Sequence, residues 1–320
     1  MGLTRRQLVA GLLALPLVGV GARAEARSVK VKDIDVGKRG VTLTLALGSA
    51  PFPFPGKRWK DDTVLVFVPH HHRVLRKDKR VDLVVHFHGH NSTARGAMES
   101  HELREQLADS KQNAILAIPQ LPVDAGTGHP GKLTEKGGLL RMLTDIRKAL
   151  QTKKVRRALG KASLHRRSRI GTLIISAHSG GYWAAAECLD HGGFEVSEVY
   201  LFDSLYGNLD EFYSWLMGSD DRKLIAYYSG GKVAKYCRHF MRKLDDAKFE
   251  YLHEKKEGEH SRADITLARA VFIATSASHR GVTHKYNELR DCLYASSLQR
   301  RLKSGWFDKK RGPRPLVPRK

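Results

Sequence analysis

The sequence predicts an α/β fold in which a mostly parallel sheet is covered by helices on both faces. Two features of the 320-residue chain support this prediction. Continuous apolar runs, typical of strands buried on both faces, alternate with stretches of helical character. No internal repeat and no linker rich in Pro, Gly or Ser divides the chain. We therefore expect one large α/β domain, and a chain of this length can bury a substantial core.

Eight apolar segments predict the strands. In chain order they are 40–47, 63–69, 82–89, 113–120, 171–179, 197–207, 222–231 and 270–278. The first two are expected to form an antiparallel pair. The segments 82–89 and 197–207 each end in a turn, and 270–278 is expected to be the last strand.

Segments between and after these strands predict the helices. In chain order they are 97–110, about 137–160, 181–192, 233–246 and a closing helix from about Thr283 to Leu302. The region 137–160 is long and basic. A loop rich in Gly and Pro, 121–133, follows the fourth strand.

Residues 1–24, MGLTRRQLVAGLLALPLVGVGARA, have the features of an export signal. Arg5 and Arg6 form a positive n-region, an apolar run follows, and the ARA of 22–24 is typical of a cleavage site. The run is too short for a membrane span, so we expect no transmembrane segment after processing. The segment 4–8 also resembles a twin-arginine signal. We expect an exported protein, periplasmic or secreted; a buried N-terminal helix is the alternative.

The rest of the chain is expected to comprise one domain, 25–308, and a flexible basic tail, 309–320. Three cysteines, an odd number without CxxC spacing, indicate neither a zinc ribbon nor a dense disulfide framework. They are Cys188, Cys237 and Cys292. One bridge between two of them stays open.

The net charge is +23 and falls to +20 after removal of the leader, which holds three arginines and no acid. Such a positive field attracts anionic surfaces and polymers. The basic stretches 153–169, 238–243 and 309–320 match no nucleic-acid-binding motif with interleaved aromatic residues, so we expect no specific nucleic-acid partner. They are expected to be solvated faces, with an anionic envelope polymer as the possible partner.

The stretch LIISAHSGGYWAAAE, 173–187, places Ser179 where a buried strand turns sharply into a helix. Backbones approach closely at such a turn, so the positions two before and two after the serine must be small; Ala177 and Gly181 meet this need. AHSGG resembles the G-x-S-x-G nucleophile elbow of the α/β-hydrolases, with alanine in the first position. The resemblance implies a three-layer sandwich and a nucleophilic Ser179. Its alternative role is that of a helix N-cap.

The strand 82–89 runs into His88-Gly89-His90-Asn91, which resembles the HG turn after the third strand of that family. The resemblance implies an oxyanion hole made by a backbone N–H near His90 and the N–H of Gly180. A metal site is the other interpretation of this segment. The side chains of His86, His88 and His90 alternate along the strand, and the histidines of 69–72 are nearby. No carboxylate or cysteine completes a first shell, so we expect no metal.

The family order of serine, then acid, then histidine implies an acid after Ser179. Asp203 ends the next strand on the same sheet edge. The commonest family arrangement places the acid one strand later, but that strand ends in YYSGGKV without an acid. We therefore predict Asp203, with capping of its own turn as the alternative role.

The base is expected beyond the last strand, in ATSASHRGVTHKYNELRDCL, 274–293. His279 follows the strand in a loop, whereas His284 is expected in the first turn of a helix capped by Thr283. A loop residue swings more freely toward Ser179, and the family carries its base in this loop. We predict His279, with His284 as the alternative and His260 as a third candidate.

The resemblance covers most of the chain after the leader and implies an exported, carboxylesterase-like serine hydrolase. Ser179, His279 and Asp203 would cleave a carboxylic ester, in a small molecule or a polymer, through an acyl-enzyme. No metal or organic cofactor is implied. Two alternatives stay open: an amidase or peptidase acting on a peptide or cell-wall linkage with the same residues, and a non-catalytic protein of this fold that binds an anionic envelope polymer.

Overall fold

The computed structural model describes residues 29–74, 79–126, 128–301 and 313–319. The predicted export signal, 1–24, lies outside the described residues. Within the described ranges, no helix has the length and apolarity that crossing a membrane requires.

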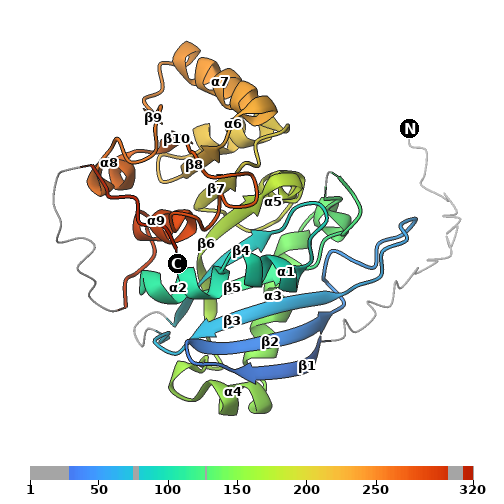
Figure 1. The fold of residues 1–320 in the computed structure, drawn as a ribbon. Helices are drawn as coiled ribbons and strands as arrows, with labels where there is room; N and C mark the ends of the chain where they lie inside the picture. The colour runs from blue at the N-terminus through green and yellow to red at the C-terminus, as the bar shows by residue number, and fades with distance from the viewer. Residues whose placement is uncertain (1–28, 75–78, 127, 302–312, 320) are drawn as a thin grey trace, which may run out of the picture.

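The described strands form one sheet of ten in the order β1-β2-β3-β5-β4-β6-β7-β8-β10-β9 (Figure 1). They are β1 Val29–Val36, β2 Gly40–Leu47, β3 Thr63–Pro69, β4 Arg80–Phe87, β5 Ala114–Pro119, β6 Arg169–His178, β7 Glu198–Phe202, β8 Lys223–Tyr228, β9 Leu252–Glu254 and β10 Ala270–Ala274. The predicted antiparallel pair is confirmed as β2 and β3, and β3 is also antiparallel to β5. From β5 to β9 all neighbours run parallel, so the mostly parallel sheet is confirmed.

Helices cover both faces of this sheet, as predicted. They are α1 Ala94–Ser100, α2 Leu103–Ser110, α3 Gly138–Leu150, α4 Lys153–Leu159, α5 Tyr182–Asp190, α6 Leu209–Met217, α7 Gly231–Asp246, α8 Arg262–Leu267 and α9 Glu288–Tyr294, with short 3₁₀ turns η1 Gly131–Thr134, η2 Gly160–Ala162 and η3 Ser179–Gly181. Helices α3 to α7 share one hydrophobic core with the sheet. Helices α1, α2, α8 and α9 share a second core on the other face.

Each central strand serves both cores, because its side chains point alternately to the two faces. In β6, Leu173 and Ile175 belong to the first core, whereas Ile174 belongs to the second. All three are fully buried. This arrangement explains the continuous apolar runs in the sequence.

Three predicted helices are wrong in extent. The segment 97–110 is broken into α1 and α2 at His101 and Glu102, where the backbone of Glu102 turns left-handed (φ 48°). The basic region 137–160 is likewise two helices, α3 and α4. The closing helix is limited to α9, because turns occupy the chain before Glu288. The elements β1, α6, β9 and α8 were not predicted.

The predicted flexible tail is wrong for the part of it that the structure describes, 313–319, because this segment packs on the domain. Arg314 inserts its side chain against Glu254, with hydrogen bonds of 2.6 and 2.8 Å to the two carboxylate oxygens. Both side chains are almost fully buried. The backbone N–H of Arg319 donates to the carbonyl of Lys285, so the segment also holds the loop that follows β10.

We expect Arg314→Met to lower the free energy of unfolding by about 3–5 kcal/mol, because it leaves the buried Glu254 carboxylate without its charge partner. The double variant Glu254→Gln/Arg314→Met removes both charges and is expected to recover part of the loss. Urea denaturation of the three proteins measures both effects. A loss below about 1 kcal/mol in the single variant would show that the tail contributes little to the fold.

Candidate active site

Ser179 stands at a tight turn between β6 and α5. Its backbone is left-handed (φ 52°), a conformation that L-residues adopt at a cost of about 1–3 kcal/mol. A Cβ on Gly181 would lie 2.4 Å from the carbonyl oxygen of Phe87, and a Cβ on Gly89 would lie 2.7 Å from the Cβ of Ser179. The small residues around the serine are therefore required by the close approach of β4 to this turn.

Three of the predicted side chains meet at the carboxyl edge of the sheet. The hydroxyl of Ser179 donates to Nε2 of His279 at 2.9 Å. Nδ1 of His279 donates to a carboxylate oxygen of Asp203 at 3.1 Å. These residues follow β6, β7 and β10, which are parallel strands. The topology thus brings together groups 76 and 100 residues apart in sequence.

Asp203 is held as a buried carboxylate. The backbone N–H of Ser229 donates to one carboxylate oxygen at 2.7 Å, and the hydroxyl of Ser229 donates to the other. Burial raises the pKa of Asp203, but the hydrogen bonds from His279 and Ser229 outweigh it and hold the pKa below its usual value. Both oxygens therefore point to His279 and Ser229. Ser229 was not predicted, because only the fold places the end of β8 beside Asp203.

His178 fixes the loop that carries His279. The Nε2–H of His178 donates to the backbone carbonyl of His279 at 2.8 Å, and the two ring centroids lie 4.9 Å apart. His178 is buried, and its other neighbour is the ring of His101 at 4.6 Å. Sequence reasoning missed this contact because it joins the strand end of β6 to a loop about 100 residues later.

The other candidate bases lie elsewhere. His284 sits in the turns before α9 instead of in a helix, and its ring stacks on that of His101 at 5.9 Å. Burial lowers the pKa of His284. His260 lies 3.5 Å from Glu254, beside Arg314. Among the described histidines, His279 is the one that bonds Ser179.

The HG turn lies against the serine, as the proximity of Gly89 to Ser179 shows. His90 is exposed and Gly180 is buried. Among the loop and turn hydrogen bonds of the described residues, none has the backbone N–H of His90 or Gly180 as its donor. The next N–H, that of Asn91, donates to the carbonyl of Val123 at 2.7 Å. His90 and Gly180 therefore stay the candidate oxyanion donors, whereas the N–H of Asn91 is occupied.

Two of the histidines considered for a metal, His86 and His88, have hydrogen-bond partners within the protein. His86 contacts the hydroxyl of Ser176 at 2.9 Å. His88 donates from Nδ1 to the carbonyl of Gly89 and accepts at Nε2 from the N–H of Leu121, so both ring nitrogens are occupied. Burial lowers the pKa of His88 to about 4. In the described part of the chain, no three His, Cys, Asp or Glu side chains are placed to hold a metal ion.

The three cysteines, Cys188, Cys237 and Cys292, are buried free thiols.

Two aromatic residues at the start of α5, Tyr182 and Trp183, follow the turn of Ser179 and contact rings from distant segments. The ring centroids of Tyr182 and Tyr206 lie 6.0 Å apart. Trp183 lies 5.2 Å from His129, whose ring centroid is 6.1 Å from that of Trp59. Sequence reasoning did not identify these contacts, because they join segments far apart in the chain.

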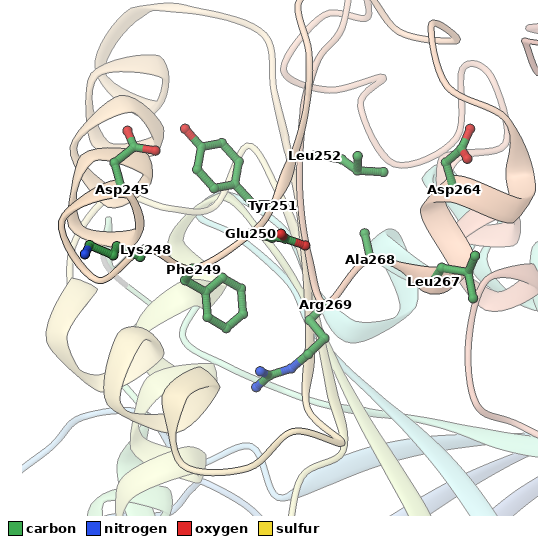
Figure 2. Close-up of a pocket in the computed structure, with 10 residues that line it drawn as sticks. All are labelled: Asp245, Lys248, Phe249, Glu250, Tyr251, Leu252, Asp264, Leu267, Ala268 and Arg269. Carbon is green, nitrogen blue, oxygen red and sulfur yellow. The ribbon is translucent and has the colours of Figure 1, made fainter.

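A cavity of about 900 Å³ lies at the opposite edge of the sheet (Figure 2). Its lining residues include Phe249, Tyr251 and Leu267, at the amino ends of β9 and β10. Since Ser179, Asp203 and His279 follow the carboxyl ends of parallel strands, this cavity is separate from their site.

No family profile and no curated protein matches this chain. Solved structures that resemble it include an S-formylglutathione hydrolase from Agrobacterium tumefaciens, 10% identical over 84% of this chain and 100% of that chain, with a TM-score of 0.46. A substrate-bound fluorophosphonate-binding serine hydrolase from Staphylococcus aureus is 11% identical over 85% of this chain and 99% of that chain (TM-score 0.46). A ferulic acid esterase is 12% identical over 84% and 95% (TM-score 0.45).

These identities are too low to carry an activity over to this chain. The order and direction of the strands identify the fold. Eight strands follow the order β2-β3-β5-β4-β6-β7-β8-β10, β3 is antiparallel to both neighbours, and a strained serine joins β6 to α5. The chain therefore has an α/β-hydrolase-like fold.

Proposed function

We propose that the protein is a serine hydrolase that cleaves a carboxylic ester through an acyl-enzyme. One observation carries the proposal: Ser179, His279 and Asp203 form a continuous hydrogen-bonded chain, with 2.9 Å and 3.1 Å between successive groups. Such a chain gives a serine hydroxyl a base within reach and gives that base an orienting acid. Export through the leader 1–24 is part of the proposal and rests on the sequence alone.

In the acylation step, the Oγ of Ser179 attacks the ester carbonyl while Nε2 of His279 takes its proton. Negative charge develops on the carbonyl oxygen, where the N–H groups of Gly180 and His90 would bind it. The tetrahedral intermediate then collapses: the bond to the leaving alkoxide breaks, and His279 returns the proton to it as the alcohol leaves. Water, deprotonated by His279, attacks the acyl-enzyme and releases the carboxylic acid and Ser179.

Asp203 would stabilise the protonated His279 that forms in both steps. Because its folded-state pKa lies below its usual value, the carboxylate stays ionised throughout the neutral range. Its bond to Nδ1 also fixes the tautomer that leaves Nε2 free to accept from Ser179. The exposed side of His279 faces solvent, since 43% of its side chain is accessible, so water can reach the acyl-enzyme.

Removal of His178 tests whether the loop that carries His279 must be held. We expect His178→Ala to lower kcat by about 10²-fold with little change in KM, because a base displaced by about 1 Å loses its alignment with Ser179. His178→Gln keeps an N–H donor near the same place and is expected to restore much of the rate. If both variants lose kcat and unfold equally, His178 supports packing instead of the position of the base.

A substrate panel tests the proposed function. Wild-type protein and Ser179→Ala are assayed on 4-nitrophenyl esters of acetate and butyrate, on matched 4-nitroanilides, and on peptidoglycan. Turnover of the esters by wild-type protein alone supports the proposal. Turnover of the anilides or peptidoglycan in preference to the esters would favour the amidase. Equal residual rates in both proteins on every substrate would leave only the non-catalytic polymer-binding protein.

A further inference from the structure

The exposed face of α7 is basic over most of its length, up to the exposed Asp245 and Asp246 at its end. From Lys232 to Arg242, every exposed residue of this helix is Lys, Arg or His: Lys232, Lys235, Arg238, His239 and Arg242. A solvated helix face normally mixes both signs of charge, which avoids repulsion between neighbours three and four residues apart. The stretch 238–243 contributes no residue to the proposed active site, and this concentration of like charge is unfavourable unless a ligand or counterion offsets it.

This face begins beside the acid of the active site. Ser229, which holds both oxygens of Asp203, precedes the first residue of α7, Gly231, by two positions. A tyrosine ring also lies close to Asp203. Tyr206 lies near enough to Asp203 that the carboxylate adds to the rise that burial gives the pKa of Tyr206.

Tyrosine side chains lie between Ser179 and α7. Tyr182 follows Ser179 by three residues, and its ring centroid lies 6.0 Å from that of Tyr206. A Cβ on Gly207 would lie 3.3 Å from the ring of Tyr182, and Gly207 comes two residues before the start of α6. Burial raises the pKa of Tyr182, and Tyr236 of α7 raises it further. These rings therefore lie between the turn that holds Ser179 and the starts of α6 and α7.

A cavity of about 850 Å³ opens there, between α7 and the start of α6. Its lining consists of Leu209, Gly231, Lys232, Lys235, Tyr236 and His239. Its volume is in the range of small-molecule sites, and its apolar wall of Leu209 and Tyr236 suits the carbon skeleton of a ligand. The ammonium group of Lys232 lies 5.7 Å from the Tyr236 ring centroid, at the rim.

Among the described residues, neither Lys232 nor Lys235 forms an ion pair. The acids of the neighbouring α6 are already engaged: Asp210 pairs with Lys243, and Glu211 accepts from the side chain of Asn208 at 2.9 Å. An apolar cavity with two unpaired cations at its rim is complementary to an organic anion.

We propose that this α6–α7 cavity binds a carboxylate group of the substrate, so that the esters cleaved at Ser179 are anionic. The inference rests on the proposed function. A carboxylate is favoured over a phosphate because the cavity offers two lysines, which act as point charges, and no arginine fork among its lining residues. The site thus selects substrates that carry a negative charge away from the scissile bond.

The test compares pairs of esters, called twins here, in which one member carries the carboxylate and the other its neutral methyl ester. 4-Nitrophenyl hydrogen adipate carries a carboxylate on the acyl side, and 4-acetoxyphenylacetate carries one on the leaving group; the methyl ester of each is its neutral twin. We expect wild-type protein to prefer at least one anionic ester by about tenfold in kcat/KM, the effect of two partly exposed ion pairs. The preference should shrink in 0.5 M salt, since exposed charges are screened.

Matched charge reversals locate the effect. Lys232→Glu/Lys235→Glu is expected to abolish the preference, with kcat/KM for the anionic ester falling to that for its methyl ester or below it. The control is Lys153→Glu/Lys154→Glu on α4, two exposed lysines at the other end of the sheet (Figure 1). It makes the same change in net charge and is expected to keep the preference. Equal loss in both double variants would overturn the proposal, because the effect would then belong to the overall charge.

A binding measurement keeps the test independent of turnover. Calorimetry of the Ser179→Ala protein with the intact anionic esters is expected to show binding that Lys232→Glu/Lys235→Glu removes. This readout tests the cavity even where wild-type protein hydrolyses no ester, the result that would refute the proposed function. Equal binding of both twins, or tighter binding of a phosphate-ended analogue than of the carboxylate, would overturn the proposal.

Discussion

Replacement of His279 by alanine is expected to reduce the acylation rate by about 10³–10⁶-fold, the range found when members of a catalytic triad are removed. The reason is geometric. A general base must lie within about 3 Å of the hydroxyl that it deprotonates, and Nε2 of His279 is 2.9 Å from Ser179 Oγ. Single-turnover measurements with a 4-nitrophenyl ester isolate this step, because release of the chromophore reports acylation directly. KM should change far less, since the imidazole acts mainly in proton transfer.

His284→Ala is the matched control, because His284 lies in the same connection after β10. We expect this variant to lower the acylation rate by less than about tenfold. The ring of His284 stacks on that of His101, and burial lowers the pKa of His284. Near-normal turnover by His279→Ala together with an inactive His284→Ala would reassign the base. That result would leave the assignment of Ser179 as the nucleophile unchanged.

Asp203→Asn is expected to lower kcat by about 10⁴-fold, the second large effect. An asparagine keeps the shape of the side chain but loses the charge that stabilises the protonated His279. Its amide can also present an N–H to Nδ1, which would favour the tautomer that cannot accept from Ser179. The measurement is kcat on a 4-nitrophenyl ester, with circular dichroism to verify that the variant is folded.

Ser229→Ala serves as the graded comparison for Asp203→Asn. It removes one hydrogen bond to the carboxylate, while the backbone N–H of residue 229 still donates to the other oxygen at 2.7 Å. We expect a loss of about tenfold or less, since the charge itself remains. An Asp203→Asn variant within tenfold of wild type would show that Asp203 is a capping residue of its turn and not the orienting acid.

Much of the framework could be predicted because it depends on local pattern. Buried parallel strands such as β6 and β8 read as continuous apolar runs, and the small residues around Ser179 are demanded by the close approach of β4. The carboxyl edge of a parallel sheet then places Asp203 and His279 near the serine. The exposed edge strand β1 and the short β9 were missed, since neither forms such a run.

What could not be predicted depends on contacts between distant segments. The bond from His178 to the carbonyl of His279 and the support of Asp203 by Ser229 arise only after the strands have aligned. The same holds for Arg314, whose charge suggested a solvated tail until the fold supplied the buried Glu254. The last helix was predicted too long because Thr283 resembles a cap in sequence, whereas the chain forms turns up to Asn287.

Covalent labelling tests directly whether Ser179 is an activated nucleophile. Wild-type protein is incubated with a fluorophosphonate, which forms a stable bond with an activated serine oxygen, and the modified residue is located by mass spectrometry of the digested protein. We expect one adduct per chain, located on Ser179. The adduct should be absent in Ser179→Ala and should form slowly in His279→Ala. No adduct on the wild-type protein, or an adduct on another residue that persists in Ser179→Ala, would contradict the assignment of Ser179 as the nucleophile.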